Sequence, residues 1–150
     1  MSESQVQYFK LLEKKFSIEE DIYKKLGDLQ DLKKKIADQN KKRAKDQRER
    51  EENLIDMANY EAEGITDKAL KSEVKAKKKE ASIAEKDYKI REFERRIVKV
   101  EEELTKLENE LQEAENDINA HESGEPVYKE PVYQEDQPPL EPTVFEDIEE

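Results

Sequence analysis

The chain has 150 residues, of which 45% are charged and only 33% hydrophobic, and its net charge is −12. A globular domain of this length needs an apolar share of about half to fill its core, so the composition excludes one and favours elongated helices, disorder, or both in different segments. The charge is uneven, because residues 101–123 and 124–150 each carry nine acids against a single lysine.

The residue types that the chain lacks exclude further classes of protein. There is no cysteine, which excludes a disulfide framework and thiolate chemistry. The longest apolar runs are two or three residues, far short of the roughly 20 that span a bilayer, and residues 1–30 carry acids instead of a secretory signal. We therefore expect an intracellular, cytoplasmic protein with no membrane contact.

Residues 1–62 are predicted to form a first long helix, because they contain no proline, one glycine and many strong helix formers. Ser2 and Gln5 make a capping-box pattern at its start, and Ser17 and Gly27 are sites for a kink. A broad apolar face between Tyr8 and Ile18 indicates a further packing partner. Beyond it, a seam on alternating steps of four and three is expected at Ile22, Leu26, Leu29, Lys33, Ile36, Asn40, Arg43, Gln47, Arg50, Leu54 and Met57.

Residues 63–67 are predicted to form a turn, with Gly64 ending the first helix and Thr66 or Asp67 capping the next. A second helix is expected over residues 68–122. It has a strict seven-residue repeat, which is typical of a coiled coil, and the e positions of this repeat from Glu73 to Glu115 are all acidic. The predicted oligomerisation seam consists of Ile83, Ile90, Phe93, Ile97, Val100, Leu104, Leu107, Leu111 and Ile118.

Two arrangements of these helices are open. In an antiparallel hairpin about Thr66 and Asp67, paired residue numbers add to about 133, which places Ile22 on Leu111 and Ile36 on Ile97. The alternative is one unbroken helix of about 115 residues, roughly 170 Å long, that pairs in parallel with a second copy. We favour the hairpin because its apolar layers outweigh the small electrostatic terms of the rod.

Residues 123–150 are predicted to be an extended acidic tail, because all five prolines lie there among the acids. The sequence Glu-Pro-Val-Tyr occurs at residues 125–128 and again at 130–133, with a looser copy at 141–145. Two interpretations of this segment are open: an acidic tail that only keeps the chain soluble, and a linear motif that binds a protein partner. We favour the motif, because a solubilising segment has no use for repeated aromatic residues. The predicted partner-binding residues are Val127, Tyr128, Val132, Tyr133, Val144 and Phe145.

No catalytic, cofactor-binding or metal-binding residue is predicted. His121 is the only histidine, and three isolated glycines cannot build a phosphate-binding loop. The basic stretch of residues 33–50, with a second lysine cluster at residues 71–79, leaves electrostatic nucleic-acid binding as an alternative function.

The sequence as a whole predicts an all-α, elongated, non-enzymatic coiled-coil protein that self-associates through its helices and binds a protein partner through its tail. In composition it resembles assembly factors, virion scaffolding or accessory proteins, and coiled-coil adaptors. If the scaffold interpretation holds, the chain resides within a viral particle.

Overall fold

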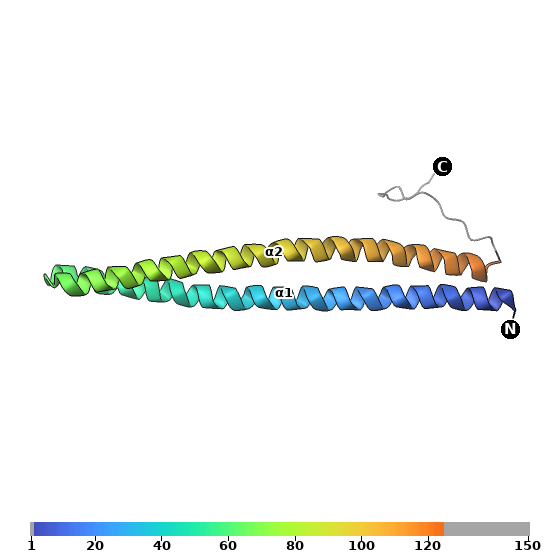
Figure 1. The fold of residues 1–150 in the computed structure, drawn as a ribbon, viewed down its shortest axis with the longest axis horizontal. Helices are drawn as coiled ribbons and strands as arrows, with labels where there is room; N and C mark the ends of the chain where they lie inside the picture. Colours follow the sequence, from blue (N-terminus) through green and yellow to red (C-terminus); the bar gives the residue numbers. More distant parts are fainter. Residues whose placement is uncertain (1, 125–150) are drawn as a thin grey trace, which may run out of the picture.

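The computed structural model describes residues 2–124, and these form two long helices that lie side by side and antiparallel (Figure 1). Helix α1 spans Glu3–Ala62 and helix α2 spans Thr66–Glu122. The prediction of an all-α chain is confirmed for the described residues, and the two helices pack as a hairpin. The predicted tail lies outside the described residues from position 125 onward.

Helix α1 begins at the predicted capping box. The Ser2 hydroxyl accepts a hydrogen bond from the Gln5 backbone N–H at 3.1 Å, and the Gln5 side chain accepts one from the Ser2 N–H at 2.9 Å. These two bonds satisfy donors that a helix start leaves unpaired. The helix then continues without interruption through Ser17 and Gly27, so neither residue restarts it.

The turn between the helices is shorter than the sequence suggested and is centred on Gly64. Gly64 has φ +75°, a left-handed conformation that glycine adopts without steric cost. The Ile65 N–H donates to the Tyr60 carbonyl at 2.8 Å and the Gly64 N–H donates to the Glu61 carbonyl, which together form a Schellman motif. The prediction that Thr66 or Asp67 caps α2 is wrong, because Ile65 occupies the N-cap and α2 already begins at Thr66.

The position of this turn sets the register of the two helices. The side chains of Lys15 and Glu115, Arg43 and Asp87, and Arg50 and Glu80 form ion pairs whose residue numbers all add to 130. At the open end of the hairpin, the rings of Tyr8 and His121, which add to 129, lie 5.6 Å apart.

The predicted sum of 133 is therefore wrong by about one helical turn, and Ile22 does not lie opposite Leu111. The reason is that the chain reverses at Gly64 and not at Thr66 and Asp67. Sliding one helix by about four residues keeps the same faces in contact but changes which layers meet.

The seam of α2 follows the predicted heptad. All nine predicted seam residues are buried or half-buried, and the same frame extends to Ala69, Ala76 and Ala114, of which the last two are only 1% exposed. Small residues at these positions let the helices approach closely. No large side chain is fully buried among the described residues, which is expected for a core only two helices thick.

The seam of α1 differs from the prediction at every second position. Ile22, Leu29 and Ile36 are half-buried as expected, but Leu32 is buried, whereas Leu26 is 45% exposed. The seam therefore steps by three after Ile22 and then by four. In the predicted frame, four residues are exposed and each is displaced by one residue from the observed seam positions Lys25, Leu32, Gln39 and Asp46: Leu26, Lys33, Asn40 and Gln47. Leu54 is half-buried, as is its neighbour Asn53.

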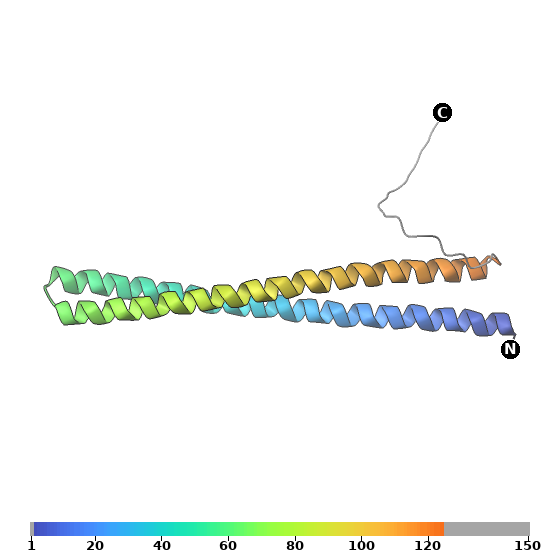
Figure 2. The same cartoon turned by 45° about the horizontal axis from the view of Figure 1, so that its top comes forward.

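The two helices also wind around one another. Figure 2 shows that α1 and α2 exchange sides between the turn and the open end of the hairpin. A seven-residue repeat on an α-helix of 3.6 residues per turn requires such supercoiling to keep its seam facing the partner helix.

Candidate functional site

The predicted partner-binding residues of the tail lie outside the described residues, and their role stays a prediction. The nine predicted seam residues are buried or half-buried in the hairpin. Because a single chain is present, α1 alone accounts for their burial. A contact between these residues and a further chain stays a prediction.

The most organised side-chain cluster lies in the seam between the middle of the hairpin and the turn, and we call it the polar layer: Asp46, Glu49, Lys79, Ser82 and Lys86. Asp46 is only 7% exposed. Its carboxylate accepts hydrogen bonds from Ser82 Oγ at 2.6 Å and forms an ion pair with Lys86 Nζ at 2.7 Å. Lys86 Nζ also donates to Ser82 Oγ at 2.7 Å, so the three groups form a closed triangle.

A second ion pair extends the polar layer toward the turn. Lys79 Nζ lies 2.7 Å from Glu49 Oε1 and 3.8 Å from Asp46 Oδ1, so one ammonium lies between two carboxylates of α1. Two arginines of α1 lie on either side of the layer along that helix. Arg43 donates two hydrogen bonds to Asp87, at 2.5 and 3.4 Å, and Arg50 donates to Glu80 at 3.0 Å.

The electrostatics of the polar layer favour the charged forms of its members. The hydrogen bond from Lys86, and then that from Ser82, hold the pKa of Asp46 below its usual value. The hydrogen bond from Lys79 likewise lowers the pKa of Glu49, and the same bond raises the pKa of Lys79. At neutral pH the layer is therefore a set of paired charges within the seam.

The charges of the polar layer are paired with one another. Its carboxylates are already paired with ammonium groups, and it contains no histidine or cysteine. Within residues 2–124, no group of three or more His, Cys, Asp or Glu side chains is placed to hold a metal ion. A polar group at a single seam position specifies register and orientation in coiled coils, because any other alignment leaves it buried and unpaired.

Sequence reasoning missed the polar layer because the predicted frame of α1 placed Gln47 in the seam instead of Asp46. The signal that could have found it is the strict period of 3.5 residues from Ile18. That period places Asp46 on the seam, where Lys86 Nζ reaches its carboxylate.

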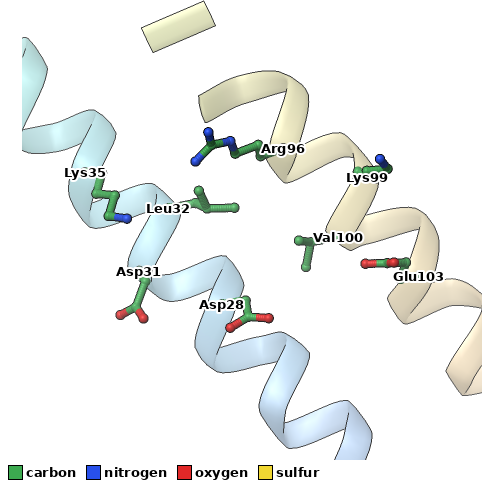
Figure 3. A pocket seen from close by; sticks show the side chains of 8 residues that line it. All are labelled: Asp28, Asp31, Leu32, Lys35, Arg96, Lys99, Val100 and Glu103. Carbon is green, nitrogen blue, oxygen red and sulfur yellow. The ribbon is translucent and has the colours of Figure 1, made fainter. Parts of the chain in front are cut away.

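An open groove lies between the helices about halfway along, with a volume of about 320 Å³ (Figure 3). Leu32 and Val100 point toward one another across it. The remaining lining residues are three acids and three bases, so the groove offers no net charge that would select a charged ligand: Asp28, Asp31, Lys35, Arg96, Lys99 and Glu103.

The basic stretch of residues 33–50 is only partly available to an external ligand. Arg43 and Arg50 bind acids of α2, and Lys42 and Arg48 form ion pairs with acids one turn away. In the second cluster, Lys79 is part of the polar layer.

The open end of the hairpin is joined by polar contacts between the first and last turns. The Tyr8 hydroxyl donates to Glu122 Oε2 at 2.8 Å, and Ser4 Oγ lies 3.3 Å from His121 Nε2. The hydrogen bond to Glu122 raises the pKa of Tyr8. His121 therefore occupies the last seam layer of the hairpin, against Tyr8.

Neither helix of the described part is long and apolar enough to cross a membrane.

Comparison with known proteins finds no relative of this chain. No family model, curated protein or solved structure matches the chain, so its function is argued from its own residues.

Proposed function

We propose that the protein is a non-enzymatic coiled-coil structural or interaction protein, a scaffold, assembly factor or adaptor. Its hairpin serves as a spacer and self-association element, and its tail binds a protein partner. The observation that best supports this role is the polar layer within a continuous two-helix seam. A seam with a register-defining cluster favours a spacer of one length and one alignment.

The place where the tail leaves the hairpin supports its role as a ligand. The chain passes from α2 into the tail at Gly124, beside the first turn of α1. The last seam residue of α2 is His121, so the seam of the hairpin is complete before the tail begins. On this proposal the tail binds the partner and the helices keep their own packing.

Truncation after Ser123 tests this division of roles. The truncated chain should keep the melting behaviour and oligomeric state of the full chain but should fail to co-purify with its partner. Replacing Tyr128, Tyr133 and Phe145 by alanine should produce the same failure at unchanged charge, because buried aromatic residues supply most interface energy. Replacing the tail acids by glutamine should instead slow association and reduce its salt dependence. Unchanged capture by the aromatic variant would contradict the proposed motif.

The alternative function, electrostatic nucleic-acid binding, has less support, because Arg43 and Arg50 of the basic stretch bind acids of α2. Its test should use exposed lysines, since replacing Arg43 would also remove a contact between the helices. Lys34, Lys41 and Lys45 replaced by alanine should weaken any such binding and flatten its dependence on salt. Unchanged affinity would exclude this function.

A further inference from the structure

An apolar stripe lies on the outside of α1 near the open end of the hairpin. Its six positions, which we call the α1 stripe, recur at steps of three and four as in a coiled-coil seam, although they do not face α2: Phe9, Leu12, Phe16, Glu19, Tyr23 and Leu26. Phe16 is 56% exposed and Tyr23 is 73% exposed. A shallow hollow of about 440 Å³ lies between these two rings, with Glu19 in its lining.

A second stripe of the same length lies on the outside of α2 near the turn. Its six positions, which we call the α2 stripe, also recur at steps of three and four: Leu70, Val74, Lys77, Ala81, Ala84 and Tyr88. All six side chains are exposed, Leu70 by 53% and Tyr88 by 58%. Each stripe contains one charged residue, a glutamate in the α1 stripe and a lysine in the α2 stripe.

The two stripes of one chain cannot meet. In the observed register, the α1 stripe lies alongside residues 103–120 of α2, whereas the α2 stripe lies alongside residues 41–59 of α1. The stripe centres are thus about 33 residues apart along the hairpin, which is about 50 Å. Four residues of the α1 stripe are exposed, and Leu12 and Glu19 are half-buried. Apolar stripes with seam-like spacing that are exposed to this extent are a feature of surfaces that pack on another helix.

The charge of the hairpin changes sign between the two stripes. Near the open end, residues 101–123 carry nine acids and one lysine. Near the turn, residues 63–100 carry twelve basic and eight acidic residues. The open end of one copy is therefore electrostatically complementary to the turn end of another.

We propose that the α1 stripe of one copy packs antiparallel on the α2 stripe of a second copy. This inference rests on the self-association in the proposed function and assigns the surfaces that carry it. Antiparallel alignment of the two six-position stripes places Glu19 opposite Lys77, Phe16 opposite Ala81 and Tyr23 opposite Val74. Parallel alignment instead places Phe16 on Lys77 and Glu19 on Ala81, so neither charge meets an opposite charge of the other copy. Lys77 is 3.7 Å from Glu73 of its own helix, and its side chain is 71% exposed, which leaves it accessible to a second carboxylate.

The pairing also defines how the assembly grows. In it, neighbouring hairpins point the same way and are offset by about 50 Å, roughly half their length. The surfaces that meet are different on the two copies. The pair therefore keeps two unpaired stripes, the α2 stripe of the first copy at one end and the α1 stripe of the second copy at the other. An interface of this heterologous kind adds further copies in a row until the row closes on itself or ends.

Charge exchange between the stripes tests the pairing. Glu19→Lys and Lys77→Glu each place like charges opposite one another, and each should raise the dissociation constant of self-association about tenfold. A mixture of the two variants should recover association, because every contact between unlike copies again joins a lysine to a glutamate. The double variant Glu19→Lys/Lys77→Glu should also recover it alone. Sedimentation equilibrium of the full-length chain over a concentration series measures all four.

Matched controls make the same charge changes away from the stripes. Asp21→Lys and Lys75→Glu lie on the same two helices but about 100° or more around them from the stripes, and both should associate like the parent. Phe16→Ser removes a ring from the proposed contact and should weaken association more than tenfold, with the helix content unchanged by circular dichroism.

The outcomes separate this pairing from self-association in general. Recovery in the mixture and in the double variant supports the pairing. If the parent associates but the single exchanges have no effect, or if neither combination recovers association, the stripes do not form the interface. A parent that stays monomeric at every concentration would refute both the pairing and the self-association on which it rests.

Discussion

Removing the carboxylate of Asp46 should destabilise the hairpin far more than removing an exposed acid. The carboxylate holds Ser82 Oγ and Lys86 Nζ at 2.6 and 2.7 Å, and the side chains of Asp46 and Lys86 are only 10% and 16% exposed. Asp46→Ala leaves a half-buried ammonium with a single hydroxyl partner. Hydrogen bonds to charged groups contribute about 1.5–3 kcal/mol, and breaking a buried pair costs about 3–5 kcal/mol, so we expect a loss of about 2–4 kcal/mol.

This loss is large enough to measure by urea and thermal unfolding followed by circular dichroism. For a chain of this length it corresponds to a melting temperature lower by about 5–15 °C. Asp56→Ala, at an exposed acid of the same helix, is the matched control and should change stability by less than about 0.5 kcal/mol. Equal unfolding curves for the two variants would refute the structural role of the polar layer.

Three further results are expected. Because the pKa of Asp46 is lowered in the folded chain, its contribution to stability is complete above about pH 4 and is lost as the pH falls through the folded pKa. Asp46→Asn should therefore lose less stability on acidification than the parent. Identical profiles of stability against pH for the two chains would contradict this. Gly64→Ala should destabilise the hairpin by about 1–2 kcal/mol, because Gly64 has a positive φ. Gly27→Ala lies within α1 with open space around its Cα and should stabilise the hairpin by up to about 1 kcal/mol. Urea unfolding measures both changes, and equal effects would refute the assignment of the turn. Tyr8 should ionise at higher pH than an ordinary tyrosine. Ultraviolet titration of the parent should show this ionisation as a late step, which should be lost in both Tyr8→Phe and Glu122→Gln. A late step that persists in either variant would contradict the hydrogen bond between Tyr8 and Glu122.

The sequence predicted α2 better than α1 because their seams carry different amounts of apolar side chain. Residues 83–118 of α2 place an isoleucine or leucine at every seventh position, so only one frame fits. In α1, the next seam position after Ile22 is either Lys25, three residues on, or Leu26, four residues on. Hydrophobicity alone selects Leu26. The packed structure selects Lys25, because the lysine stem lies along the seam while its ammonium reaches Glu103 at 3.0 Å.

The turn and the polar layer were beyond sequence reasoning for a related reason. A glycine followed by threonine and aspartate offers several places to reverse the chain, and local signals do not distinguish them. The Schellman hydrogen bonds donated by Gly64 and Ile65 determine where the chain reverses. Their position shifts the register of the two helices by about one helical turn from the predicted one. Only in the resulting register does Asp46 lie beside Ser82 and Lys86.

The winding of the two helices has a consequence for any long partner that approaches the hairpin from one side. Supercoils of this kind complete one revolution in roughly 150 Å, so a hairpin of about 60 residues, or about 90 Å, turns through more than half of one. Figure 2 shows the exchange of sides that results. A straight filament laid along the molecule therefore meets α1 at one end and α2 at the other, and crosses the groove between them in the middle. Such a filament samples both helices in a single contact, whereas a short ligand bound at one position meets one helix face only.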